Sequence, residues 1–554
     1  MTSSVDLLIR GATVFDGSGS PGRAADVTVK DGRIVDVGAT NTDARSVVDA
    51  SGLALMPGII DVHTHYVAQI TWDPTLSPSP ALGVTTALIG NCGFGIAPCP
   101  APLRETMLKN LSVVEGMDLD ALTAGTQWEF ETFSEYLDFL RRQRPYVNVG
   151  VYAGHSCIRT AVMGEEASTR KEPTAAELAA MQRLVREAMA DGAVGFASSF
   201  SPNHFGYGGQ PMPSTIASDG ELRALISAMA SSDRGVFMMA TGPRATPEFM
   251  ESVAAETGRP MFISTVLTMY NDAAPARAAT YYERCAEAIA RGHEVFIQTT
   301  CQPLSFDFSL LDPYLLLSHD AFDRVKAARP DELAAIYGDP AFRARFRENL
   351  AHPKPGILFF GDWSKVELEG RAVSDLAREV DKDALDYFFD SALERGLGTQ
   401  FIAKLFQNND AGVAPLLKHP AGVVALSDAG AHLLYFCDAG FGLHFLSHWV
   451  RETGTFTLEE GVRRLTSDLA DKFRISERGR IAPGAWADLV LFDPATVGLS
   501  PVIRVPDLPG GGARMIRKPR GLAGVWVNGV QVFDGADYVR LEKGPGAVLD
   551  RFDS

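Results

Sequence analysis

The stretch Gly58-Ile59-Ile60-Asp61-Val62-His63-Thr64-His65 ends a run of apolar residues with two histidines. Side chains two apart on a β-strand point to the same face, so His63 and His65 can converge on one point. Two convergent imidazoles make half of a site for a divalent metal. A histidine pair alone is more often packed or exposed without a metal, but its place directly after an apolar strand favours the metal interpretation.

The sequence on both sides of this stretch alternates between apolar, β-rich runs and amphipathic helical segments. Continuous apolar runs suit strands that are buried on both faces of a parallel sheet. The runs are 58–62, 85–90, 147–152, 193–197, 235–240, 261–264, 294–298 and 422–426. Helices are predicted between them, for example over 175–190, 219–230 and 280–290. This alternation predicts an α/β fold of the TIM-like (β/α)8 barrel type.

The two ends of the chain have a different sequence pattern, with short β-rich segments separated by residues that favour turns. These segments are 5–10, 25–30, 33–37, 487–492, 524–527 and 530–533. Asn528-Gly529 separates the last two, and Asn-Gly between apolar runs is the strongest short hairpin signal. We therefore predict a small β-sandwich domain built from residues 1–56 and 475–554, with the barrel over 57–474.

Residues from about 302 to 417 are too many for an ordinary βα loop, so we expect an insertion near the barrel mouth. Helices are predicted inside it over 331–337 and 383–394, and a lobe or lid over the active site is the expected result. Aromatic residues in and near this region either line an aromatic pocket or form the lobe core. They are Phe205, Tyr207, Tyr270, Trp363, Tyr435, Phe436 and Trp449.

Composition excludes several classes of function. The 554 residues carry a net charge of −17 and no basic run, which argues against a nucleic-acid partner. No uninterrupted apolar stretch approaches the length of about 18 residues that a membrane span needs. The first ten residues lack a secretion signal, and the six cysteines lack disulfide or metal-knuckle spacing. We expect a cytoplasmic enzyme with a small-molecule substrate.

Asp428 and Cys92 are the next candidates for metal chemistry. Asp428 ends the last predicted strand, where a carboxylate can touch a metal and accept a proton from water as a general base. A helix N-cap is the alternative role for Asp428. Cys92 lies in Gly90-Asn91-Cys92-Gly93, directly after the second strand. A thiolate there would bind a metal well, and a buried free thiol is the alternative.

His155 and Arg159 follow the third predicted strand, in Gly154-His155-Ser156-Cys157-Ile158-Arg159. Both are candidate catalytic residues that would orient a substrate carbonyl or carboxylate. A surface ion pair is an equally good interpretation of Arg159.

These segments together resemble the amidohydrolase superfamily. Gly90-Asn91-Cys92-Gly93-Phe94 makes the closer resemblance one to the D-aminoacylase (N-acyl-D-amino-acid deacylase) branch. Ser427-Asp428 and the tail segment Gly479-Arg480-Ile481-Ala482-Pro483-Gly484 agree with it. The resemblance covers essentially the whole chain outside the 302–417 insertion.

The resemblance implies a set of roles. His63, His65 and Cys92 would bind a divalent metal, one zinc ion with manganese or iron as alternatives, and Asp428 would be the general base. The reaction would be hydrolysis of an amide C–N bond by metal-activated water. Large barrels of this superfamily often pair, so a homo-oligomer is also implied, although nothing in the sequence identifies an interface.

The sequence departs from the branch at the expected catalytic face. The branch has a histidine at the ends of its fifth and sixth strands, whereas Met239-Ala240-Thr241-Gly242 and Ile263-Ser264-Thr265-Val266 contain none. Thr and Gly cannot replace an imidazole as zinc ligands. Two alternatives therefore stay open: a metal-dependent lyase, decarboxylase or C–C hydrolase, and a non-catalytic scaffold protein that has lost zinc. The retained His63, His65 and Asp428 argue against the scaffold.

Overall fold

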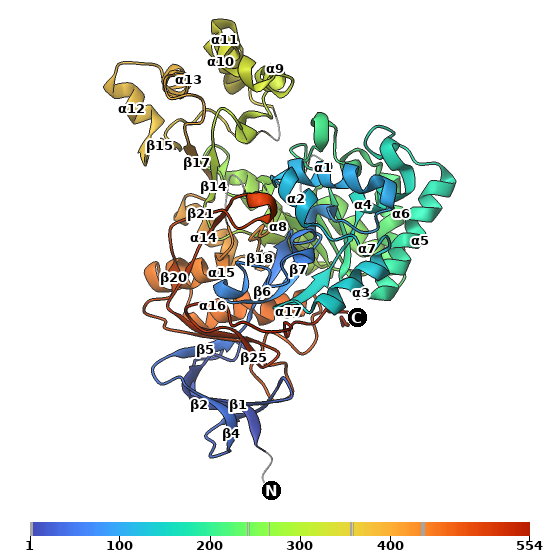
Figure 1. Ribbon diagram of the computed structural model, residues 1–554, viewed down its shortest axis with the longest axis vertical. Coiled ribbons are helices and arrows are strands. Elements are labelled where there is room, and N and C mark those ends of the chain that lie inside the picture. Colours follow the sequence, from blue (N-terminus) through green and yellow to red (C-terminus); the bar gives the residue numbers. More distant parts are fainter. Residues whose placement is uncertain are drawn as a thin grey trace.

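The predicted apolar runs are strands in the computed structural model of the chain (Figure 1). The structure describes residues 4–553 apart from 241, 243, 265, 355, 356, 358 and 434–437. Each of the eight runs is confirmed within two residues. The strands are β6 (Ile59–Thr64), β7 (Val84–Ile89), β8 (Asn148–Val151), β10 (Gly195–Ser199), β11 (Val236–Ala240), β12 (Met261–Ser264), β13 (Val295–Thr299) and β18 (Gly422–Val424).

These strands pair in parallel and in chain order. One sheet has the order β6-β7-β8, and a second has the order β18-β13-β12-β11-β10-β9, where β9 is Ala153–Gly154. Only Tyr152 separates β8 from β9, and Ala429 after β18 forms a parallel bridge to Thr64 on β6. Because parallel strands in chain order share their direction, their carboxyl ends lie at one edge. The fold is mixed α/β.

Amphipathic helices connect the strands and cover them from outside (Figure 1). The helices α5 (Ala175–Asp191) and α6 (Asp219–Ala230) confirm the predicted ranges, and α8 (Pro275–Ala290) begins five residues earlier than predicted. Proline at the first position starts α8, since its missing N–H is not needed there. A capping box between Thr174 and Glu177 starts α5.

The two ends of the chain share one sheet of eight strands. Its order is β25-β24-β19-β5-β1-β2-β3, with β4 paired to β1. The strands are β1 (Val5–Val14), β2 (Arg23–Lys30), β3 (Arg33–Gly38), β4 (Ala44–Asp49), β5 (Ala54–Pro57), β19 (Leu489–Phe492), β24 (Leu522–Val527) and β25 (Val530–Phe533). Asn528 and Gly529 both have positive φ, which confirms the predicted hairpin. The sandwich arrangement stays a prediction.

A lobe with its own hydrophobic core interrupts the chain between β13 and β18 and projects from the body (Figure 1). Its sheet has the order β14-β17-β15-β16. Its elements include β14 (Leu304–Phe308), β15 (Val366–Leu368), β16 (Arg371–Ala372), β17 (Phe401–Phe406), α10 (Leu333–Gly338), α11 (Pro340–Ala351), α12 (Val373–Glu379) and α13 (Ala384–Glu394). Trp363 packs against Phe359 and Phe388 inside this lobe, as a core residue would. The predicted limits of the insertion stay a prediction.

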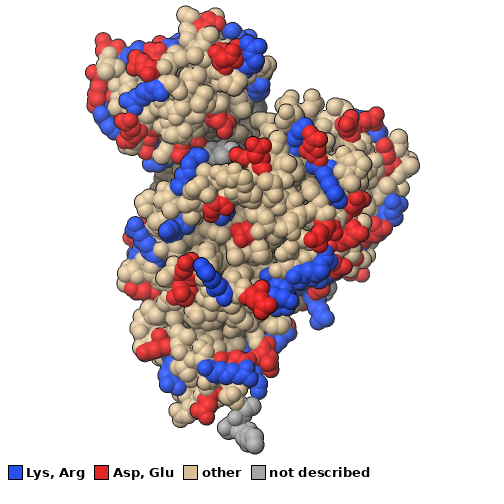
Figure 2. All heavy atoms as spheres, in the orientation of Figure 1, with Lys and Arg blue, Asp and Glu red and all other residues tan. Residues whose placement is uncertain are grey.

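The surface carries charges of both signs. Figure 2 shows Lys and Arg side chains interspersed with Asp and Glu over the face it presents. Among the described residues, none of the helices combines the length and the apolar character that crossing a membrane requires.

Candidate metal centre

Four buried side chains meet at the carboxyl ends of β6, β7 and β18. The Nε2 atoms of His63 and His65 lie 3.2 and 3.3 Å from the same Oδ1 atom of Asp428. Cys92 Sγ lies 3.6 Å from His63 Nε2. Ligand atoms of His63, His65 and Cys92 all lie within 4.8 Å of one another. The structure thus brings together the residues predicted from the sequence as metal ligands, here called the four-donor cluster.

The backbone around the cluster is unusual at two of these four residues. Cys92 has a φ of 57° and Asp428 a φ of 47°, both in the left-handed region. Such a conformation costs an L-residue roughly 1–2 kcal/mol, and it persists where the surroundings fix it, often at functional sites. Gly93 lets this loop approach β10, because a Cβ there would lie 2.5 Å from the Ala197 carbonyl oxygen.

The outer nitrogen of each imidazole has a buried partner. His63 Nδ1 lies 2.6 Å from Gln298 Oε1 on β13. His65 Nδ1 lies 2.9 Å from Glu115 Oε1, at the end of α1 (Arg104–Val114). Metal-binding histidines are usually oriented in this way, with the second nitrogen held by a carboxylate or carbonyl. Sequence reasoning missed both partners, although the place of Gln298 at a strand end was a usable signal.

Charge within the cluster is balanced between the acid and the imidazoles. Burial alone would raise the pKa of Asp428, but His63 and His65 hold it well below its usual range. Burial alone would lower the pKa of His63, but Cys92 and Asp428 raise it to about 10. The anionic donors therefore stabilise positive charge at this point, which is the property that a cation site needs.

Asp61 is hydrogen-bonded to two segments that carry residues of the cluster. Its Oδ2 accepts a hydrogen bond from Ser427 Oγ at 2.5 Å, and its Oδ1 accepts one from the His63 backbone N–H at 3.3 Å. Burial raises the pKa of Asp61 to about 7, although both hydrogen bonds oppose the shift. Asp61 therefore ties the end of β6 to the loop that carries Asp428.

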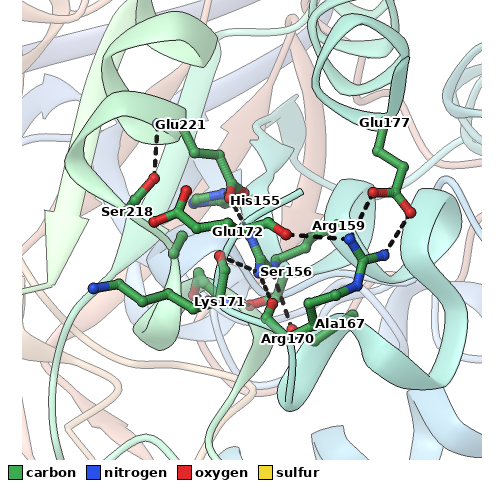
Figure 3. A network of polar contacts seen from close by, with 12 residues as sticks. His155, Ser156, Arg159, Ala167, Arg170, Lys171, Glu172, Glu177, Ser218 and Glu221 are labelled. Carbon is green, nitrogen blue, oxygen red and sulfur yellow. Dashed lines mark hydrogen bonds and ion pairs between the residues drawn. The ribbon is translucent and has the colours of Figure 1, made fainter. Parts of the chain in front are cut away.

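His155 and Arg159 belong to a separate network, centred on Glu221 of α6 (Figure 3). His155 Nδ1 lies 2.8 Å from Ser198 Oγ, and its Nε2 lies 2.9 Å from Glu221 Oε1. Arg159 forms an ion pair with the other Glu221 oxygen and donates to the backbone carbonyls of three residues. We call these residues the Glu221 network.

The Glu221 network satisfies its own polar atoms. His155 and Arg159 are both 0% exposed, and their side-chain nitrogens are already partnered, by Ser198 and Glu221 for His155 and by Glu221 and three backbone carbonyls for Arg159. The surface ion pair considered for Arg159 is wrong, because the ion pair with Glu221 is fully buried. The catalytic roles of His155 and Arg159 stay predictions, and their contacts favour a structural role.

Two further histidines lie near the four-donor cluster, and the sequence analysis did not single them out. His204 Nδ1 lies 2.6 Å from Ser199 Oγ at the end of β10, and its ring packs edge-on against Phe94. Burial lowers the pKa of His204 to about 3, with His432 and His65 adding to the shift. His432 follows Asp428 by four residues, and its backbone N–H donates to the Glu115 carbonyl oxygen. Burial also lowers the pKa of His432, which favours the neutral form of both imidazoles.

Several buried polar atoms at the strand ends lack hydrogen-bond partners within the described parts of the chain. Buried polar atoms are normally paired, so unpaired ones at a strand end are candidates for contact with a ligand. They are Asn91 Oδ1, Tyr152 Oη, Ser264 Oγ and Gln298 Nε2. Ser264 ends β12, where the sequence lacks the sixth-strand histidine.

Comparison with known proteins decides the family. A model described as the amidohydrolase family matches residues 46–533. The chain belongs to this family. It is 28% identical over 548 residues to a D-aminoacylase of Alcaligenes xylosoxydans xylosoxydans, covering 95% of the chain and 94% of that relative. The resemblance to the D-aminoacylase branch is therefore confirmed.

Solved structures agree with this relationship. An N-acyl-D-glutamate deacylase from Bordetella bronchiseptica, complexed with zinc and a phosphonate mimic of the tetrahedral intermediate, is 27% identical. It has a TM-score of 0.67 and covers 99% of this chain and 100% of its own. A D-aminoacylase described as having a binuclear metal centre is 26% identical with a TM-score of 0.66, covering 99% and 100% of the two chains. The chain is thus an amidohydrolase, a hydrolase that acts on C–N bonds other than peptide bonds.

Proposed function

We propose that the chain hydrolyses the amide bond of a small N-acyl amino acid, with one divalent ion at the four-donor cluster. The convergence of His63, His65, Cys92 and Asp428 carries this proposal. The activities of the similar deacylases supply the substrate class.

The donor set fits zinc, with manganese or iron as alternatives. Imidazole nitrogen, thiolate sulfur and carboxylate oxygen are all common zinc ligands, and two of the four donors here have orienting partners. When bound, the ion would polarise the substrate carbonyl and lower the pKa of a water molecule. One ion is favoured over two, because β11 and β12 end in Ala240 and Ser264, which offer no imidazole.

Asp428 is the proposed general base. Its low pKa keeps it ionised at neutral pH, so it can accept a proton from the attacking water. The water oxygen bonds to the carbonyl carbon, the C–N bond breaks, and Asp428 returns the proton to the leaving nitrogen. Ser264 Oγ and Gln298 Nε2 are donors on neighbouring strands that have no partner among the described residues, and they would donate to substrate oxygens.

We also infer that the two parallel sheets close into a (β/α)8 barrel. The His65 N–H donates to the Ala429 oxygen at 2.8 Å, and the Val194 N–H donates to the Val151 oxygen at 2.9 Å. These hydrogen bonds cross both gaps between the sheets. The barrel would span 57–474, with the lobe as an insertion and residues 1–56 and 475–554 as the β-domain. The buried side chains of α14 (Asp410–Lys418) belong to the main core, which supports an insertion that ends near Phe406.

The test is amine release by protein loaded with zinc, manganese or iron. N-acetyl amino acids of both configurations would be supplied, and free amine and acetate would be measured. We expect the two products in equal amounts, and release about a thousandfold slower by Asp428→Asn. Carbon dioxide or a C–C cleavage product would favour the lyase alternative. A metal-loaded protein that converts no amide would overturn the proposal.

A further inference from the structure

The substrate needs an anchor besides the four-donor cluster. N-acyl amino acids carry a carboxylate, which proteins usually bind with arginine, because its guanidinium matches the two oxygens. Arg159 is the cation that the sequence suggested, but Glu221 and three backbone carbonyls occupy it. An N-acyl amino acid would therefore need another cation near the strand ends.

The segment that contains Arg517 contacts the loops that follow β6 and β18. It includes β22 (Arg514–Ile516), which pairs with β21 (Ile503–Val505). Arg514 Nη1 donates to the Ser77 oxygen at 2.7 Å, in the connection after β6. The Met515 N–H donates to the Leu433 oxygen at 3.0 Å, five residues after Asp428. The C-terminal segment therefore borders the loops that carry the four-donor cluster.

Arg517 is incompletely paired in this position. Its Nη1 donates to Gln302 Oε1 at 2.5 Å, three residues after β13. Its Nε is buried, and within the described residues no acceptor faces it. Leaving a buried donor without a partner is unfavourable, and an anionic ligand would supply the missing acceptor.

Asp438 completes the group around Arg517. Gln302 Nε2 donates to the Asp438 backbone oxygen at 2.7 Å. The Asp438 side chain is buried, with the residue 3% exposed, and its Oδ2 has no partner among the described residues. Burial raises the pKa of Asp438 to about 7, against the opposing effect of Arg517, while the charge of Asp428 adds to the rise. The raised pKa favours the neutral form of Asp438 as the pH falls, so Asp438 then opposes an anionic ligand less.

We propose that Arg517, held by Gln302 and bordered by Asp438, forms an anion subsite that binds the substrate carboxylate. The proposal rests on the proposed function for the identity of the substrate, and on the contacts above for the site. Arg517 would pair with the carboxylate, and Gln302 would hold Arg517 in place. The subsite lies at the junction of the C-terminal segment with the loops after β13 and β18, so the β-domain segment would contribute to substrate choice.

Binding, measured without turnover, tests this subsite. Asp428→Asn, reconstituted with zinc and checked for bound metal because Asp428 is one of the four donors, would be titrated at pH 6.5 with an N-acetyl amino acid and with its neutral primary amide. In that background Arg517→Gln is expected to weaken carboxylate binding about tenfold to a hundredfold and to leave amide binding unchanged. Arg517→Lys keeps the positive charge but lacks the two parallel N–H donors of the guanidinium, so an intermediate loss of carboxylate affinity is expected. It also serves if Arg517→Gln fails to fold.

Two controls complete the experiment. Arg504→Gln removes an exposed cation from neighbouring β21 and should change neither affinity. Asp438→Asn removes the competing carboxylate and should tighten carboxylate binding at pH 8. Equal losses for carboxylate and amide, or no loss for either, would overturn the subsite. If the protein binds the carboxylate selectively but the unmodified enzyme hydrolyses no amide, only the proposed function is overturned. If the unmodified enzyme hydrolyses the amide but Arg517→Gln does not selectively weaken carboxylate binding, only the subsite is overturned.

Discussion

The four-donor cluster and the Glu221 network are both buried groups of histidine and acid near the strand ends, yet their atoms are arranged differently. In the Glu221 network each side chain meets a partner, and His155 has both nitrogens engaged. In the four-donor cluster the outer nitrogens of His63 and His65 are held, while their inner nitrogens face one carboxylate oxygen and a thiol.

The difference separates a binding site from a structural network. Polar atoms of the Glu221 network use their hydrogen-bonding capacity on one another, so none is left for a ligand. These contacts also offset the free-energy cost of removing the atoms from water. Donors of several types that converge on one place are suited to a cation, especially where hydrogen bonds to the outer imidazole nitrogens fix their orientation. Both groups contain buried histidine and acid, and what distinguishes the four-donor cluster is that its inner atoms converge on one place.

The largest expected effect comes from removing the proposed base. Asp428→Asn should lower turnover about a thousandfold, because the amide cannot accept the proton of the attacking water. Steady-state amine release measures the loss, and thermal unfolding checks the fold. An Asp428→Asn enzyme with near-normal turnover would remove the base from the mechanism.

The second largest effect is expected from a substitution that breaks the Glu221 network. Arg159→Met should lower the free energy of unfolding by about 3–5 kcal/mol, because among the described residues it leaves the buried Glu221 carboxylate with His155 as its one side-chain partner. Urea unfolding measures the change, and Arg159→Met/Glu221→Gln should recover part of it. Metal content should stay normal in both variants. Loss of metal from the folded Arg159→Met protein would show that the two groups are coupled.

A smaller effect tests the orienting partner of His65. Glu115→Gln should weaken metal affinity about tenfold to a hundredfold, because the carboxylate no longer fixes and polarises the imidazole. Competition with a chelator measures the affinity. Glu105→Gln, on an exposed position of the same helix, is the matched control and should have no effect. If both variants bind metal equally well, the orienting role is wrong.

The smallest effect concerns pH. Burial lowers the pKa of His155, so below about pH 6.5 the unfolded chain takes up a proton that the folded chain does not. The free energy of unfolding therefore falls as the pH falls from 6.5. His155→Gln should remove part of this loss, seen as a melting temperature that drops roughly 2–4 °C less between pH 7 and 5. His448→Gln, a more exposed histidine, is the control. Parallel pH profiles for His155→Gln and the unmodified protein would contradict a neutral buried His155.

The strands and the four-donor cluster were predictable because their signals are local. Apolar runs between polar segments mark buried strands, and His63, His65, Cys92 and Asp428 each follow such a run. The partners were not predictable, because Glu221 lies 66 residues from His155 and Glu115 lies 50 from His65, with no pattern linking them. Arg517 was missed for the same reason, since the end of the chain returns to the strand ends only through the fold.

The aromatic residues had two open interpretations, and their surroundings differ. Trp363 is part of the lobe core, and Trp449 is buried and donates to the Cys301 oxygen at 2.7 Å. The ring centroids of Phe205 and Tyr314, a residue of the lobe, lie 6.5 Å apart, and Tyr207 is 54% exposed. Tyr435, Phe436 and Cys437 lie outside the described residues. Hydrophobicity alone could not separate core from pocket, because both need the same side chains.

Metal content tests the account most directly. The unmodified protein, His63→Ala and Arg159→Met would be purified, reconstituted with zinc and analysed for bound metal. We predict about one equivalent in the unmodified protein and in Arg159→Met, and almost none in His63→Ala. Metal that stays bound in His63→Ala, or an unmodified protein that takes up none, would contradict the assignment of the four-donor cluster as the metal site.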